Sequence, residues 1–390
     1  MFSRYHKTLL AVFLILSHSA SPVRAEQTDE YQEGFLTAYL NRAIEKAMSD
    51  VEAQDEPLRY GRHITKYVSP PPFGGYFVGK YSYSNKDGAD ENGFEARLIR
   101  FYVSGTILRD FKYRVQLELK NPAMRDYTLE WVRWKEFQVK VGQFKRCFTY
   151  DNPSHPWNLG MGNYSQLGRH MTALTVDDPS GEVAQNGRDI GFQLQGDLLP
   201  VGKDKHRLFR YQAAVFNGNG QNRKDNNKQK DWMGNIQVQP VKDLYIGLFG
   251  WTGTYTGQNG ASVRRNRWAI GSIYEHNDWT FKAEYAHHSG LNVHDFDTET
   301  QTWREGSTGR ADGWYIVLGV PITSWLKVYG TYDAYRKDAT FGSMKSIYGI
   351  CPNFELHKNL KFQVQYNYVN DRTSTDHNYH ELWAQTYVRY

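Results

Sequence analysis

The stretch LWAQTYVRY, residues 382–390, decides the fold of this chain. One parity holds Leu382, Ala384, Thr386, Val388 and Tyr390. The other parity holds Trp383, Gln385, Tyr387 and Arg389. Because successive side chains of a β-strand point to opposite faces, the first set forms a mainly apolar face and the second a mainly polar one. The stretch therefore predicts a strand whose two faces meet different surroundings.

A strand of this kind that ends on an aromatic residue, Tyr390, resembles the closing strand of a bacterial outer-membrane β-barrel. The 390 residues are rich in Tyr, Phe, Trp and Gly, and their mean hydropathy is -0.69. After residue 25, no apolar run approaches the roughly 18 residues that a membrane helix needs. A transmembrane barrel is polar on average, because only alternate strand residues face lipid. A soluble β protein shares this property, so the N-terminal sequence is needed to distinguish it from a transmembrane barrel.

The first 25 residues have the pattern of a secretory signal peptide. Arg4 and Lys7 form a basic start, Thr8–Leu16 (TLLAVFLIL) is a short apolar core, and Val23–Ala25 resembles a small-residue cleavage site. A single membrane anchor is the alternative, but the apolar run is too short for one. We therefore expect residues 1–25 to be removed on export.

Removal of residues 1–25 lowers the net charge of the chain. The whole chain has 47 Lys and Arg against 42 acidic residues and a pI of about 8.8. Without Arg4, Lys7 and Arg24, the mature chain keeps 44 cations, for a net charge of +2. This near-neutral balance gives no support to nucleic-acid binding. Two cysteines, Cys147 and Cys351, leave open whether the exported chain forms a disulfide.

Residues 26–72 are expected to form an N-terminal helix and a Pro-rich linker. Leu36, Leu40 and Ala43 recur at helical spacing within residues 29–51, and Pro70–Pro72 ends the pattern. Either the helix packs on the periplasmic base of the barrel, or it is an oligomerisation helix or plug.

From Phe73 to Tyr390 the period is two, and we expect an all-β, transmembrane antiparallel barrel of about 16 strands. The expected strands lie near 73–84, 93–107, 111–120, 126–134, 137–147, 187–199, 207–217, 231–240, 243–255, 264–276, 278–289, 312–320, 324–336, 343–355, 359–370 and 379–390. Long and short connections largely alternate between them. This asymmetry is typical of outer-membrane barrels, whose periplasmic turns are short and whose outer loops are long.

The longest connection, residues 148–186, follows the fifth expected strand. Loops of this length are usually functional, and in a wide barrel such a loop can fold inward and narrow the lumen. We expect a constriction loop here, with a disordered outer loop as the alternative. Lys145 and Arg146 at its base, with Arg169 and His170 within it, are the candidate constriction residues.

Four segments resemble the phosphate-selective porin O/P family: VGQFK at 141–145, NGRDIGFQL at 186–194, DWTFKAEY at 278–285, and the hairpin at 354–368. The resemblance covers roughly residues 73–390. It implies a sixteen-stranded, homotrimeric porin of the outer membrane that prefers small anions such as phosphate and needs no cofactor. The chain departs from many relatives after VGQFK, where Arg146 adds a cation. This departure bears on phosphate selectivity rather than on the barrel.

Strand parity assigns the inward face without the family. A Lys or Arg that faces lipid at mid-membrane costs about 2–4 kcal/mol, whereas a charge in the lumen stays hydrated. The expected pore-lining cations are Arg100, Lys112, Arg114, Lys120, Lys140, Arg210, Arg267, Lys282, Lys327 and Lys361. The expected inward acids are Glu118, Glu130, Asp189, Glu284 and Asp333. The cations predict a modest anion preference, and the alternative is a mixed wall that only keeps the lumen wet.

Other function classes remain open. His287 and Ser289 share one strand face and partly resemble the pair of outer-membrane phospholipase A, but Gly290 and the residues after it do not continue that motif. His377 and His380 do not form a convincing metal site, and we expect none. A non-selective general porin and a surface-structural or adhesive barrel with an occluded lumen are the remaining alternatives.

Overall fold

The structure is a computed structural model of the whole chain. It describes residues 73–88, 92–172, 186–256, 262–290, 296–297, 302–303 and 309–390, all within one compact unit, Gly61–Tyr390. The expected signal peptide, the 29–51 helix and the Pro-rich linker lie outside these residues.

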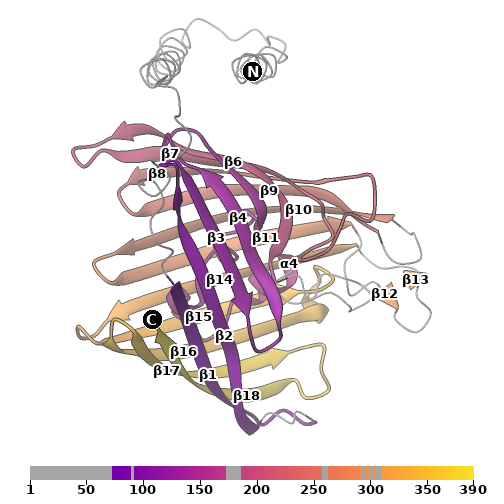
Figure 1. The fold of residues 1–390 in the computed structure, drawn as a ribbon. Helices are drawn as coiled ribbons and strands as arrows, with labels where there is room; N and C mark the ends of the chain where they lie inside the picture. Colours follow the sequence, from indigo (N-terminus) through magenta and orange to yellow (C-terminus); the bar gives the residue numbers. More distant parts are fainter. Residues whose placement is uncertain are drawn as a thin grey trace, which may run out of the picture. The chain divides into compact units, whose positions relative to one another are not determined.

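Sixteen antiparallel strands close into a barrel (Figure 1). They are β1 (Phe73–Ser84), β2 (Asn92–Ile107), β3 (Phe111–Glu118), β4 (Ala123–Trp131), β5 (Gln138–Lys145), β6 (Arg188–Val201), β7 (His206–Phe216), β8 (Asp231–Val241), β9 (Leu244–Thr256), β10 (Ser262–His276), β11 (Trp279–Gly290), β14 (Arg310–Pro321), β15 (Leu326–Arg336), β16 (Met344–His357), β17 (Leu360–Asp371) and β18 (Asn378–Arg389). Each strand pairs with its neighbours in sequence order, and β18 pairs with β1 from Tyr76↔Arg389 to Ser84↔Glu381. The predicted all-β barrel is therefore confirmed.

Two details differ from the expected strand positions. The turn between β4 and β5 starts earlier than expected, since β4 ends at Trp131. A two-stranded sheet, β12 (Phe296–Asp297) with β13 (Thr302–Trp303), lies in the connection between β11 and β14. These pieces are too short to give a period-two pattern in the sequence.

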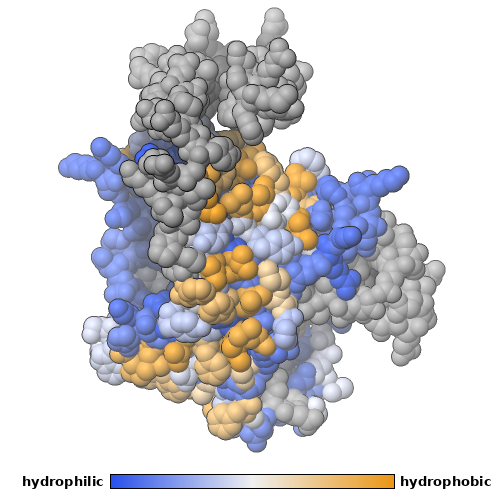
Figure 2. Space-filling model, in the orientation of Figure 1, coloured by the Kyte–Doolittle hydropathy of each residue, from blue (hydrophilic) through white to orange (hydrophobic). Residues whose placement is uncertain are grey.

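The two faces of the strands have opposite character. On β11, Trp279 and Phe281 are 47% and 37% exposed, whereas Lys282 and Glu284, of the opposite parity, are buried inside the barrel. Figure 2 shows apolar patches over the visible outer wall and hydrophilic residues gathered toward its sides. No helix among the described residues is long and apolar enough to cross a membrane.

Aromatic rings on the outer wall form two bands. Tyr332, Tyr348 and Tyr368 lie in a row near the long-loop end, with ring centroids 5.0 and 6.2 Å apart. Phe354 lies 6.1 Å from Trp325 at the short-turn end. Such belts suit the two membrane interfaces, where one part of a ring is apolar and the other is wet.

Candidate functional site

The described part of the connection between β5 and β6, residues 146–172 and 186–187, folds into the barrel, and we call it the inward loop. It contains a short 3-10 helix, η1 (Pro156–Asn158), and a helix, α4 (Gln166–Met171). Figure 1 shows α4 among the strands, and α4 contacts β11, β14 and β15. The loop thus reaches strands far from its own base.

Two buried carboxylates of the wall hold the backbone of the inward loop. Glu284 on β11 accepts the N–H groups of Tyr150 at 2.6 Å and Asp151 at 3.1 Å. Asp333 on β15 accepts the N–H group of Gln166, the first residue of α4, at 2.8 Å. Hydrogen bonds to charged groups are stronger than those between neutral groups. These two acids therefore fix the beginning and the helical part of the loop.

Donors of the wall bind loop carbonyl groups in the same way. The bonds run from Lys282 to Asn158 at 3.1 Å, from Asn353 to Gly160 at 2.9 Å, from Gln385 to Gly162 at 2.9 Å, from Arg267 to Met171 at 2.7 Å, and from Lys361 to Trp157. The donors come from β10, β11, β16, β17 and β18. We call this half of the barrel, β9 to β18, the packed side.

The close approach of loop and wall depends on glycine and on aromatic packing. Gly160 has a φ of +79°, and a Cβ added there would lie 2.4 Å from the Tyr329 ring. No other residue fits such a position without displacing its neighbour. Near the loop base, the Phe148 ring is fully buried and lies 5.7 Å from the Trp251 ring.

The loop is also bonded to itself. Asp151 accepts the N–H group of Ser165 at 2.9 Å and its hydroxyl at 2.7 Å. Burial raises the pKa of the Asp151 carboxyl, although the bonds from Ser165 oppose this shift. Lys145 donates to the carbonyl groups of Asn152 and Ser154, each at 2.8 Å. The turn at 151–154 is thereby closed over the end of β5.

The donors and acceptors that hold the loop across the lumen come from β10 to β18, and we call the five strands β3 to β7 the open side. Two cations flank one acid there, and a third cation lies two residues further along β3. Lys112 pairs in register with Glu130, and Glu130 pairs with Lys140 on the next strand. Lys112 is exposed, while Arg114 and Lys140 are half-buried. The Arg114 guanidinium lies over Tyr102 at 4.2 Å. We call Lys112, Arg114 and Lys140 the cationic row.

His155 belongs to the inward loop and lies beside Tyr76 on β1. Its ring lies 4.7 Å from that of Tyr76, and it is half-buried. Burial lowers the pKa of His155 to about 4, and the nearby cations Lys145, Arg100 and Arg114 add to this shift. The imidazole is therefore neutral at neutral pH, within electrostatic reach of Arg114 of the cationic row.

The ten predicted pore-lining cations occupy different environments. Lys112, Arg114, Lys140 and Arg210 are on the open side. Arg267, Lys282 and Lys361 are buried against the inward loop. Arg100 is buried and bonded to Glu118 at 2.8 Å. Lys120 lies in the turn after β3, bonded to Glu95 at 2.7 Å, and Lys327 lies 3.7 Å from Asp278 at a short turn. The ten cations therefore do not form one continuous lining.

The four candidate constriction residues also separate. Arg146 is fully buried, donates to Asp189 at 2.8 Å, and lies 5.0 Å from the centre of the Trp251 ring. Lys145 is engaged by loop carbonyl groups, as described above. Arg169 and His170 lie on α4, and His170 stacks on Tyr335 with ring centroids 4.5 Å apart. The structure thus places Arg146 in the base of the loop rather than at the surface of the lumen.

Three inward cations escaped the parity argument. β-bulges at Val78/Gly79 and at Gln116/Leu117 shift the register, so Arg97 and Arg125 point inward against the strict alternation. Arg97 donates to Gln385 at 2.8 Å and Arg125 donates to Gln221 at 3.1 Å. The third, Arg188, bonds to Asp126 at 2.8 Å. It belongs to the GRDIG segment, so its position in that motif could have drawn attention to it.

The His287–Ser289 pair lies on the outward face of β11. His287 is in register with Asp312, but Arg336 and the Tyr285 hydroxyl bond to that carboxylate. The carboxylate therefore orients an arginine instead of the imidazole, which is not the arrangement of a catalytic triad.

The other candidate groups have structural partners. His380 contacts the Tyr366 hydroxyl at 2.7 Å, and His377 contacts the Asp371 carbonyl at 3.2 Å. Within the described ranges, no three His, Cys, Asp or Glu side chains are grouped as metal ligands. Cys147 and Cys351 are buried free thiols.

Comparisons with known proteins agree with this architecture. The family model of phosphate-selective porin O and P matches residues 75–243. The fold is similar to an anion-selective porin from Comamonas acidovorans, with 10% identity and a TM-score of 0.60 over 82% of this chain and 99% of that one. OmpT of Vibrio cholerae in its trimer form has 11% identity and a TM-score of 0.56, with the same coverage. The outer membrane channel DcaP of Acinetobacter baumannii has 10% identity and a TM-score of 0.57, over 82% and 97%. No curated protein matches the sequence. The chain therefore resembles the phosphate-selective porin O and P family over its first strands and has a porin-type barrel.

Proposed function

We propose that this protein is an outer-membrane porin that lets small solutes diffuse passively and prefers anions. The observation that carries the proposal is the cationic row on the open side, opposite an inward loop that fills the other half of the barrel. The row has three cations, Lys112, Arg114 and Lys140. Lys112 and Lys140 flank Glu130, and the carboxylate nearer to Arg114, Asp126, is already bonded to Arg188. A positive wall that faces a narrowed aqueous lumen raises the local concentration of anions.

The buried charges support the same conclusion, because three of the buried cations are each paired with a carboxylate. Arg100 pairs with Glu118, Arg146 with Asp189 and Arg188 with Asp126. A buried ion pair contributes little net field outside itself, so it does not select between ions. The residues of the cationic row are less buried than these pairs, and we assign the selectivity to the row.

Phosphate and similar small oxyanions are the proposed solutes. Arg114 presents a planar guanidinium suited to two parallel hydrogen bonds with an oxyanion. Lys140 on β5 supplies a second charge, with strand β4 between the two residues. The match to the phosphate-selective family and the similarity to an anion-selective porin support this choice. We also propose a homotrimer in outer-membrane lipid, for which the trimer form of OmpT is the supporting case.

The test is the reversal potential of single channels in a planar bilayer under a KCl gradient. A reversal potential close to the equilibrium potential of chloride, together with a current that added phosphate reduces, supports the proposal. Steady conductance without selectivity would leave a general porin. A purified, folded protein that passes no current would reject the channel and favour the adhesive barrel with an occluded lumen.

A further inference from the structure

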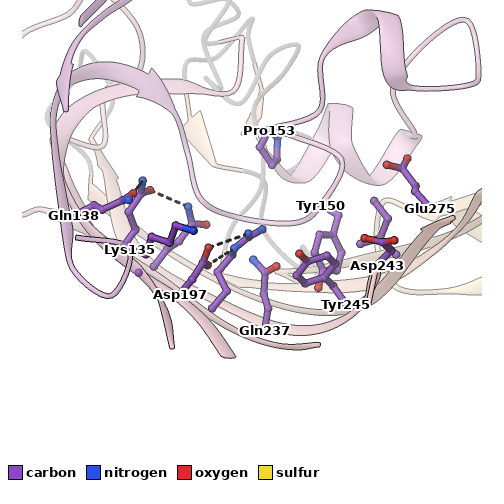
Figure 3. A pocket seen from close by; sticks show the side chains of 14 residues that line it. Lys135, Gln138, Tyr150, Pro153, Asp197, Gln237, Asp243, Tyr245 and Glu275 are labelled. Atoms are coloured by element: carbon purple, nitrogen blue, oxygen red, sulfur yellow. Dashed lines mark hydrogen bonds and ion pairs between the residues drawn. The ribbon is translucent and has the colours of Figure 1, made fainter. Parts of the chain in front are cut away.

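A second polar region lies beside the cationic row, at the short-turn end of the barrel. A cavity of about 490 Å³ is bounded by the inward loop on one side and by strands β5 to β10 on the other. Figure 3 shows Pro153 of the loop opposite the wall that carries Gln138, Asp197 and Gln237. None of the three residues of the cationic row lines it. We call this space the amide cavity.

Neutral amides form a connected chain along the wall of the amide cavity. The bonds run from Gln195 to Gln138 at 3.1 Å, from Gln212 to Gln195 at 3.3 Å, from Asn235 to Gln212 at 2.8 Å and from Gln237 to Asn235 at 3.0 Å. Gln195 is saturated, because it also donates to Glu130 and accepts from Gln193, each at 2.6 Å. Gln212 and Gln237 each use one of their two N–H donors in the chain, which leaves the other for a solute. The chain also fixes the orientation of each amide.

The charges of the amide cavity do not favour an anion. Its wall holds the carboxylates of Asp197, Asp243 and Glu275 and the cations Lys135 and Arg210. Arg210 bonds to Asp197 at 2.8 Å. Lys282 bonds to Glu275 at 2.9 Å. The wall therefore has no surplus of cations to attract an anion, so the chemistry of the cationic row does not continue here.

Two tyrosines complete the cavity. Tyr150 comes from the inward loop and Tyr245 from β9, and both lie at the same end of the cavity in Figure 3. The Arg210 guanidinium lies 5.0 Å from the centre of the Tyr245 ring, which holds that ring in place. The Tyr150 hydroxyl has no hydrogen-bond partner among the residues that the structure describes. That hydroxyl is fully buried, so only other atoms of the Tyr150 side chain can contact a solute in the cavity.

We propose that the amide cavity binds neutral, hydroxyl-rich solutes of the size of a mono- or disaccharide during passage. A sugar hydroxyl both donates and accepts, which matches a wall of amides, and the apolar face of a sugar ring packs on tyrosine. The volume falls within the usual range of small-molecule sites, about 300–1,000 Å³. The proposal rests on the chain being an open channel, but it does not depend on the anion preference.

The test is a sucrose titration of single-channel current, with a polyethylene glycol of similar hydrodynamic size as the comparison solute. We expect sucrose to reduce the current with saturation, and the glycol to reduce it only in proportion to its concentration. Gln212→Leu and Tyr245→Leu should each raise the half-saturating sucrose concentration roughly five- to ten-fold, as expected for one lost contact. Tyr332→Leu, on the lipid-facing wall, is the matched control and should leave the titration unchanged.

The outcomes separate this proposal from the porin function. Equal, unsaturated effects of sucrose and glycol in conducting channels would overturn the amide cavity as a binding site and leave the porin intact. Saturation that is insensitive to both Gln212→Leu and Tyr245→Leu would also overturn it. Channels that conduct no ions would reject both proposals together. Conductance of each variant in the absence of sugar shows that it has folded.

Discussion

The open and packed sides of the barrel have the same strand pattern and opposite uses. On both, Lys, Arg and amide side chains alternate with lipid-facing apolar residues. On the packed side, Lys282 and Arg267 donate to carbonyl groups of the inward loop and are buried. On the open side, Lys112 and Lys140 flank Glu130 and keep contact with the lumen. An inward charge therefore has two possible roles, to hold a loop or to meet a solute, and only the path of the loop decides between them.

The largest contrast concerns stability. Arg146→Ala would leave the fully buried Asp189 without its cation, and we expect a loss of about 3–5 kcal/mol. Arg210→Ala on the open side removes a half-exposed pair with Asp197, whose expected cost is about 0–1 kcal/mol. Denaturant-induced unfolding in detergent micelles, followed by tryptophan fluorescence, measures both. Equal losses would contradict the distinction between a fully buried and a half-exposed ion pair.

These residues show how much of the site could be predicted from the sequence. Alternation predicted that Lys112, Lys140 and Lys282 point inward, because the cost of placing a cation in lipid depends only on strand parity. The burial of Lys282 could not be predicted, because it depends on where residues 156–163 cross the lumen. That path is set by Glu284 and Asp333, which lie well over a hundred residues further along the chain.

Parity also fails wherever a strand carries an extra residue. Arg125 follows a bulge in the β3–β4 pair and points inward, one position out of phase with Asp126 and Thr128. No local signal in the sequence marks this bulge. A single extra residue thus hides a cation from an argument that succeeds for most of the barrel.

The next contrast concerns how far the inward loop narrows the lumen. Glu284→Gln replaces a carboxylate that accepts the N–H groups of Tyr150 and Asp151 and the hydroxyl of Tyr315. The amide keeps one acceptor and presents an NH₂ group to a donor, so the start of the inward loop should be released. We expect a higher single-channel conductance with more open-channel noise.

Glu130→Gln is the matched control for this change, because it alters the same residue type on the open side. It should leave the noise unchanged and increase the preference for chloride. An Glu284→Gln channel with the conductance and noise of the parent would show that the loop is held without this carboxylate.

A smaller effect is expected from reversing one charge of the cationic row. Lys140→Glu should lower the chloride-to-potassium permeability ratio roughly five-fold, which corresponds to about 1 kcal/mol for a charge that meets ions in a screened lumen. Lys361→Gln, on the packed side, should leave the reversal potential unchanged, because Lys361 is buried beneath the loop. A reversal potential that responds to Lys361→Gln and not to Lys140→Glu would exchange the roles of the two sides.

The smallest expected effect is a pH step at His155. An ordinary histidine gains its charge near pH 6.5, but burial and the nearby cations lower the pKa of this one to about 4. The imidazole is therefore neutral from pH 7 down to about pH 5, and protonation below that adds a positive charge beside the cationic row. Anion preference should stay constant between pH 7 and 5 and rise as the pH falls through about 4. His155→Gln should remove this rise, measured as the reversal potential over the same pH range. A rise centred near pH 6.5 would instead mean that the ring is solvated, and that the turn at 151–154 does not hold it against Tyr76 in the working channel.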